Sequence, residues 1–105
     1  MDNILDSKCM AFAVRIVRFY KFLVHDKKET VISKQMLRSG TSIGANAKEA
    51  AYAQSKADMI TKLFIAQKEC AETEYWLELL YKTEYISKKE YDSIFPQCRE
   101  LTNIL

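Results

Sequence analysis

The scarcity of chain-reversing residues is the feature that most restricts the fold of this sequence. Its 105 residues include only two glycines and one proline. A β-sandwich or barrel needs many tight turns, and such turns depend on glycine and proline. The composition therefore favours a few long elements joined by short connections. The length suits one small core, so we expect residues 1–105 to form a single domain.

Apolar residues recur at intervals of three and four along four segments, as in amphipathic helices. The spacing predicts helices over 4–26, 34–53 and 56–84. A last helix is expected to open with the capping box "SKKE" at 87–90 and to continue, with a kink at Pro96, to Leu105. Ser33 and Ser55 are the expected N-caps of the second and third helices. Four helices with short connections predict an all-α fold, an antiparallel up-and-down four-helix bundle.

Two of these helices carry more apolar surface than one neighbouring helix can cover. On the first, Met10, Val14 and Val17 belong to one stripe at helical spacing, and residues such as Phe12 and Ile16 widen the apolar arc to far more than half of the helix surface. On the third, two apolar stripes run side by side, and Trp76 lies behind both. The excess predicts contact with a second subunit, so we expect a homo-oligomer.

Both glycines fall in one short stretch, "SGTSIGANAKEAA" at 39–51, inside the second predicted helix. Glycine within a helix is unfavourable by roughly 1 kcal/mol relative to alanine. Gly40, Gly44 and Ala47 would form a ridge almost without side chains, along which another helix could pack closely. The alternative is that one of the glycines ends the helix as a C-cap.

A polar line runs beside this ridge and has two interpretations. Arg38, Ser42, Asn46 and Glu49 follow one another at helical spacing. The line either faces water or forms a polar seam of small residues against a second subunit. The excess apolar surface of the neighbouring helices favours the seam.

The cysteines and the N-terminal segment indicate a cytoplasmic protein. Cys9, Cys70 and Cys98 are far apart in sequence and form no CxxC pair, as expected for buried free thiols in a reducing compartment. "MDNILDSKCM" lacks the basic and then apolar pattern of a signal peptide. No uncharged apolar run approaches the roughly 20 residues that span a bilayer, so no membrane partner is expected.

No constellation of residues for catalysis or for a metal emerges from the sequence. Glu69 and Glu72 have a spacing seen in carboxylate-bridged metal bundles, and Glu49 could join them, but His25 has no carboxylate three residues before it. One histidine cannot serve as base for scattered serines and cysteines. We therefore expect no enzyme, no metal and no cofactor.

Charge is unevenly distributed along the chain, although the net charge is only +2. Residues 1–68 hold twelve basic against six acidic residues, and residues 69–105 hold four against eight. The basic residues of the first two helices and their connection form a candidate phosphate-binding surface, with Phe19 and Phe22 placed to stack on bases. This basic set is Lys8, Arg15, Arg18, Lys21, Lys27, Lys28, Lys34 and Arg38. The alternative is a solvated helix face.

Residues 35–80 closely resemble the small bacterial four-helix bundle proteins first noticed in intervening sequences of 23S ribosomal RNA genes. The similar elements are "SIGAN" followed by "EA", the Ser-then-Asp start of the third helix, "KLFIA" and "ETEYWL". The resemblance implies a ring-like homopentamer without catalytic residues, for which binding of ribosomal RNA or its gene is a common suggestion. It also implies kinship with the accessory variability determinant of diversity-generating retroelements, a pentamer that binds nucleic acid and a reverse transcriptase.

Two functional hypotheses follow. The first is a non-catalytic homo-oligomer, a pentamer by resemblance, that binds structured RNA or DNA through the basic residues of its first two helices. The oligomer or helix contacts would then involve Gly40, Ser42, Gly44, Asn46, Ala47, Glu49 and Trp76. The alternative is a protein-interaction scaffold that recruits a partner enzyme and has no nucleic-acid affinity of its own.

Overall fold

The computed structural model describes residues 3–105, and this range contains four helices and no strand. The prediction of an all-α chain with four helices is therefore confirmed, with boundaries within two residues of those expected. The helices are α1 (Asn3–His25), α2 (Ile32–Ala51), α3 (Lys56–Lys82) and α4 (Lys88–Ile104).

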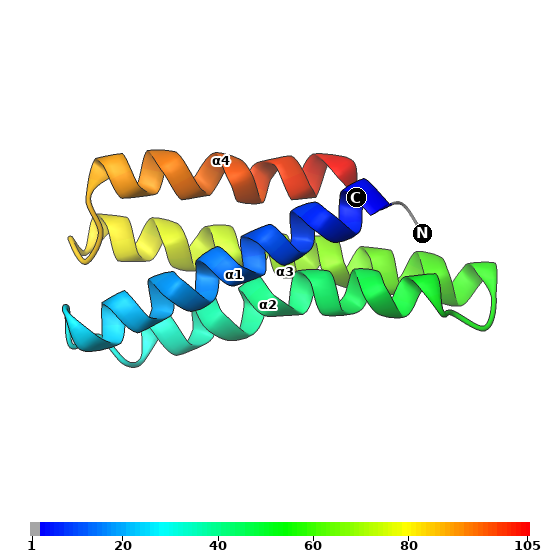
Figure 1. Ribbon diagram of the computed structural model, residues 1–105, viewed down its shortest axis with the longest axis horizontal. Helices are drawn as coiled ribbons and strands as arrows, with labels where there is room; N and C mark the ends of the chain where they lie inside the picture. Colours follow the sequence, from blue (N-terminus) through cyan, green and yellow to red (C-terminus); the bar gives the residue numbers. More distant parts are fainter. Residues whose placement is uncertain (1–2) are drawn as a thin grey trace.

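Each helix packs against two others, so the four close into a bundle. α1 lies beside α2 and α4, and α3 lies beside the same two helices, whereas within the described residues the backbones of the diagonal pairs stay apart and meet only through side chains of the shared core. The chain reverses direction at each connection, so the α1–α2 and α3–α4 connections lie together at one end (Figure 1). The α2–α3 connection projects at the other end, beyond the C-terminus of α4 (Figure 1). The molecule measures 44 × 22 × 19 Å, and α3 alone, at 27 residues, is about 40 Å long.

The core takes apolar side chains from all four helices. Its fully buried large residues include Phe12 and Ile16 of α1, Met36 of α2 and Leu77 of α3, with Leu101 of α4. In residues 3–105 no helix is both long enough and apolar enough to cross a bilayer.

Serine caps begin two of the helices as predicted. The Ser55 side chain accepts a hydrogen bond from the backbone N–H of Asp58. At Ser87 the capping box is complete, because its hydroxyl accepts from the Glu90 N–H and the Glu90 carboxylate accepts from the Ser87 N–H. α4 contains Pro96 and continues past it to Ile104. The prediction of one helix on both sides of the proline, made from the unchanged phase of the apolar pattern, is therefore confirmed.

The predicted N-cap of α2 is wrong. The helix begins at Ile32, one residue before Ser33, and no side chain of the N-cap residue Val31 closes it. The carboxylate of Glu29 does so instead, accepting hydrogen bonds from the N–H groups of Val31, Ile32 and Ser33 at 3.1, 3.0 and 2.6 Å. Burial alone would raise the pKa of Glu29, but these donors outweigh burial and hold the pKa below its ordinary value.

Several large apolar side chains remain on the surface. Met10 and Val14 of α1 are 65% and 41% exposed, and Phe64 and Tyr75 of α3 are 61% and 60% exposed. The two wide apolar arcs seen in the sequence are thus only partly used inside the bundle.

Candidate nucleic-acid interface

The structure divides the predicted basic set into two groups. Lys8 pairs with Glu100 at 2.9 Å, and Arg38 pairs with Glu72 and lies 3.8 Å from Glu69. The Arg15 guanidinium donates to two side chains of α4, the Gln97 amide oxygen at 2.9 Å and the Ser93 hydroxyl at 2.6 Å. These three cations hold helices together, so their charges are already used within the bundle.

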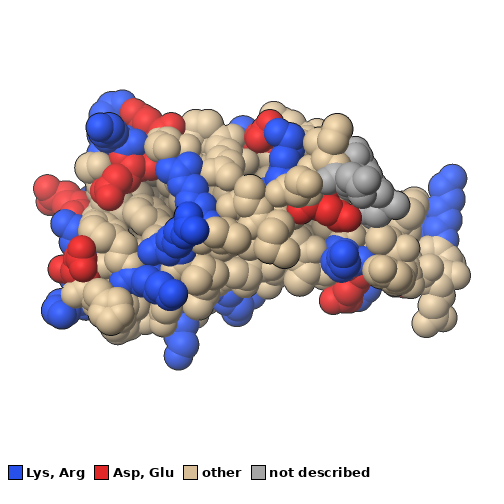
Figure 2. Space-filling view, in the orientation of Figure 1, with Lys and Arg blue, Asp and Glu red and all other residues tan. Residues whose placement is uncertain are grey.

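The other five cations are exposed and have no ion pair among residues 3–105. They lie in the second half of α1, in the α1–α2 connection and in the first turn of α2, and we call them the connection-end cluster: Arg18, Lys21, Lys27, Lys28 and Lys34. Lys and Arg side chains gather over this half of the visible face (Figure 2). Within the stretch 18–34 only Asp26 and Glu29 are acidic, and Glu29 is occupied as the cap of α2.

The aromatic residues expected beside these cations are only partly available. Phe19 and Phe22 stack at 6.1 Å between ring centroids, and both pack against the core. The Lys27 ammonium lies 5.8 Å from the centre of the Phe22 ring. The cluster is therefore suited to phosphate contact more than to base stacking.

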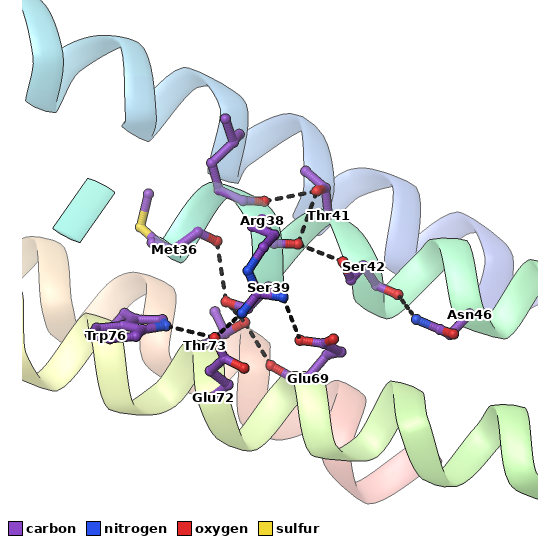
Figure 3. Close-up of polar contacts among 11 residues, drawn as sticks. Met36, Arg38, Ser39, Thr41, Ser42, Asn46, Glu69, Glu72, Thr73 and Trp76 are labelled. Atoms are coloured by element: carbon purple, nitrogen blue, oxygen red, sulfur yellow. Dashed lines mark hydrogen bonds and ion pairs between the residues drawn. The ribbon is translucent and has the colours of Figure 1, made fainter. Parts of the chain in front are cut away.

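The predicted polar line lies along the boundary between α2 and α3. Arg38 reaches two glutamates of α3, and the Trp76 indole N–H donates to Glu72 at 3.1 Å (Figure 3). The hydrogen bond from Trp76 lowers the pKa of Glu72 most. Burial acts in the opposite direction, but the nearby Arg38 adds to the effect of Trp76, so the pKa of Glu72 lies below its ordinary value. At the far end of the line Glu49 pairs with Lys62 of α3 at 2.9 Å.

The middle of the line bonds within its own helix. Ser42 donates to the Arg38 carbonyl at 2.6 Å, and Asn46 donates to the Ser42 carbonyl at 2.8 Å (Figure 3). Both side chains are half-buried. Arg38 and Glu49 are thus occupied by contacts within the chain, and Trp76 packs against the core from α3.

The glycines of α2 lie against α1. A Cβ at position 40 would come 3.0 Å from two carbons of Ile16, and a Cβ at position 44 would come 3.1 Å from the Cβ of Cys9. Neither glycine ends the helix, because α2 continues to Ala51. Ala47, one turn further on, is buried in the same core.

The three cysteines converge in the core, which their spacing did not reveal. Cys98 donates through Sγ to the Cys70 carbonyl at 3.5 Å, and burial raises the pKa of Cys9 to about 11, with Cys70 close enough to add to the effect. All three are free and buried. Residues 3–105 contain no group of three or more His, Cys, Asp or Glu side chains arranged to hold a metal ion.

Comparison with known proteins gives a family and a structural neighbour. The model of the family described as 23S rRNA-intervening sequence protein matches residues 1–105. A crystal structure of a protein of unknown function from the S23 ribosomal protein family, from Bacteroides thetaiotaomicron VPI-5482, is 59% identical with a TM-score of 0.94. The match covers 95% of this chain and 93% of that one. No curated protein matches the sequence.

Proposed function

Because this chain belongs to the 23S rRNA-intervening sequence protein family, we propose that it is a non-catalytic RNA-binding protein. In this proposal the up-and-down bundle assembles into a ring-like homo-oligomer, with five subunits by resemblance. Structured RNA, ribosomal RNA in the first instance, binds to the connection-end cluster of each subunit.

The observation that carries the proposal is the group of five exposed cations that have no acidic partner in the described part of the chain. Lysine or arginine at a phosphate releases condensed counterions from the nucleic acid, and this release provides most of the non-specific affinity. A cation already paired with a carboxylate contributes less, because that pair must first be broken. The unpaired Arg18, Lys21 and Lys28 therefore matter more to binding than the paired Lys8 or Arg38.

Assembly would make this modest cluster effective. One subunit carries a net charge of only +2, and Asp26 and Glu84 lie on the two connections at the same end. Several copies of the cluster on one assembly would contact one folded RNA together. Their phosphate contacts would then add on a single ligand.

The test is fluorescence anisotropy of a labelled RNA hairpin, titrated with protein at several salt concentrations. We expect log affinity to fall linearly with log salt, with a slope near −0.9 for each phosphate neutralised on a duplex. Arg18→Gln/Lys21→Gln should weaken binding and flatten the slope by roughly one for each cation lost per contacting subunit.

The matched control removes the same net charge from the opposite end of the bundle. Lys56 begins α3 next to the α2–α3 connection, and like Lys21 it is exposed and has no ion pair among the described residues. Lys56→Gln should leave the affinity and the slope close to those of the unmodified protein, whereas Lys21→Gln alone should weaken binding. Equal losses in these two single variants would contradict a local site and indicate an effect of net charge alone.

The second candidate is a protein-interaction scaffold, and the exposed apolar residues of α1 and α3 favour it. Met10 and Phe64 are both more than 60% exposed, and exposed apolar patches commonly mark protein contacts. Absence of RNA binding even at low salt would reject the first proposal in favour of this one.

A further inference from the structure

α1 and α2 form an apolar groove on the surface, bordered by charge. Its volume is about 360 Å³, and its walls include Met10 and Ala13 of α1 with Gly44 and Ala45 of α2. The groove exists because three of these four residues have little or no side chain. Asp6 and Lys48 stand at its polar margin, and neither has an ion pair among the described residues.

The exposed apolar residues of α1 continue from this groove as a stripe. Met10, Val14 and Val17 are 65%, 41% and 36% exposed, and their spacing of four and three places them on one side of the helix. One turn before Met10 the same side carries Asp6. This α1 stripe therefore begins at its N-terminal end with an acidic residue and continues with apolar residues.

α3 carries a second stripe with the complementary pattern. Ala57, Ile60 and Phe64 are exposed, the last two by 43% and 61%. One turn after Phe64 the same side carries Lys68, which is exposed and has no ion pair among residues 3–105. This α3 stripe begins at its N-terminal end with apolar residues and ends with a basic residue.

The two stripes cannot meet within one chain. Within the described residues the backbones of α1 and α3 do not come close to each other, and each helix packs against both α2 and α4, so the two occupy opposite corners of the bundle. A contact between the two stripes must therefore join different copies of the chain. It would be heterologous, because each copy contributes a different surface, and heterologous contacts build rings or filaments.

The spacing of the residues selects one register between the stripes. Successive steps along the α1 stripe, from Val17 back to Asp6, are three, four and four residues, and the steps along the α3 stripe from Ala57 to Lys68 are the same. An antiparallel pairing places Ile60 opposite Val14, Phe64 opposite Met10, and Lys68 opposite Asp6. A parallel pairing with Phe64 opposite Met10 would instead set Lys68 against Val14 and Ile60 against Asp6.

We propose that the α3 stripe of one subunit packs antiparallel to the α1 stripe of the next, with Phe64 entering the α1–α2 groove and Lys68 pairing with Asp6. The occupant of the groove is a second copy of this chain. The inference rests on the ring of the proposed function and specifies which surfaces build it. RNA binding is a separate property, measured separately.

The first experiment places cysteines at the two ends of the proposed ion pair. Asp6→Cys/Lys68→Cys, treated with a short bismaleimide cross-linker, should give a covalent ladder that ends at the size of the assembly. An equal mixture of the two single variants should give covalent dimers only, because each chain then has one reactive position. The native cysteines are buried, and the unmodified protein controls for their reaction.

The matched control moves one cysteine along α3. Lys56 lies twelve residues before Lys68, about 18 Å along the helix. Asp6→Cys/Lys56→Cys should therefore give no ladder. A ladder from this pair with none from Asp6→Cys/Lys68→Cys would overturn the register.

The second experiment measures mass by light scattering, with helix content checked by circular dichroism. Phe64→Ala should lower the assembled mass at a given concentration, whereas Tyr75→Ala, at an equally exposed aromatic outside the register, should not. An unchanged mass for Phe64→Ala would contradict the inference. If the unmodified protein is a multimer but neither experiment succeeds, only this interface fails; if it is a monomer, the ring of the proposed function fails as well.

Discussion

Gly44 of α2 lies directly against Cys9 of α1, so closely that a Cβ at position 44 would come 3.1 Å from the Cβ of Cys9. The carbonyl carbon and oxygen of Cys9 are also within 4 Å of that position. Backbone atoms cannot move aside as the end of a flexible side chain can. The two helices are therefore held at a separation that only a very small residue permits.

Gly44→Leu should destabilise the bundle by about 1–3 kcal/mol, because an added side chain must push α1 away from α2. The better helix propensity of leucine, worth up to about 1 kcal/mol, offsets only part of this loss. The measurement is the free energy of unfolding in urea. Gln35→Leu, at an exposed position of the same helix, is the control and should change stability little; equal stability of the two variants would contradict a close contact at Gly44.

The carboxylate that caps α2 should show its importance through pH. Glu29→Ala leaves the N–H groups of Ile32 and Ser33 without their acceptor, and we expect a loss of about 2 kcal/mol at neutral pH. Glu29→Gln should cost less, because an amide oxygen can still accept one of the bonds.

The sign of the pH effect follows from the lowered pKa of Glu29 in the folded chain. Such a group stabilises the protein above its unfolded pKa of about 4.3, and the contribution is lost as pH falls through the lower folded pKa. The stability difference between the unmodified protein and Glu29→Gln should therefore be constant from pH 7 to 6 and shrink below about pH 4.3. Urea unfolding across this range measures it, and a difference that grows on acidification would refute the assignment.

The positions of the helices could be predicted from the sequence more accurately than the contacts of individual polar and charged side chains. Periodicity placed all four helices, and the serines at 55 and 87 act as caps because their hydroxyls accept hydrogen bonds from the backbone N–H groups of Asp58 and Glu90. Glu29 was missed because a glutamate that caps from before the helix has no fixed offset to search for.

Partner choice among charges could not be foreseen, because it depends on which helices are neighbours. Lys8 and Arg18 look alike in sequence, yet only Lys8 reaches a carboxylate, that of Glu100 on α4. The convergence of Cys9, Cys70 and Cys98 likewise follows from the packing of α1, α3 and α4, and no local spacing encodes it.

The end of α3 offers a stabilising substitution. Glu84 follows the last turn of α3 and has a φ of 69°, which is the left-handed conformation. Its N–H donates to the Tyr81 carbonyl, and the Tyr85 N–H donates to the Leu80 carbonyl. These two bonds form a Schellman motif. Glycine adopts this conformation without penalty, so Glu84→Gly should raise stability by about 0.5–1 kcal/mol. Lys82→Gly, inside the last turn of the helix, should lower it; a loss of stability in both variants would contradict the argument. Thermal unfolding monitored by circular dichroism distinguishes the two results.

Ser39 and Thr73 join α2 to α3 by a hydroxyl pair at 2.8 Å, and neither side chain is exposed to solvent (Figure 3). Thr73→Val removes one hydroxyl and leaves Ser39 in the core with only the Met36 carbonyl, 3.4 Å away, as partner. We expect a loss of about 1–3 kcal/mol, the usual consequence of an unsatisfied buried polar group.

A double-mutant cycle separates this pair from simple packing. Ser39→Ala combined with Thr73→Val removes both hydroxyls together, so the double variant should lose less stability than the two single variants added, by about 0.5 kcal/mol or more. The free energy of unfolding of all four proteins provides the test. Strict additivity would mean that the two hydroxyls do not interact and that each is satisfied by its own helix, through Met36 and Glu69.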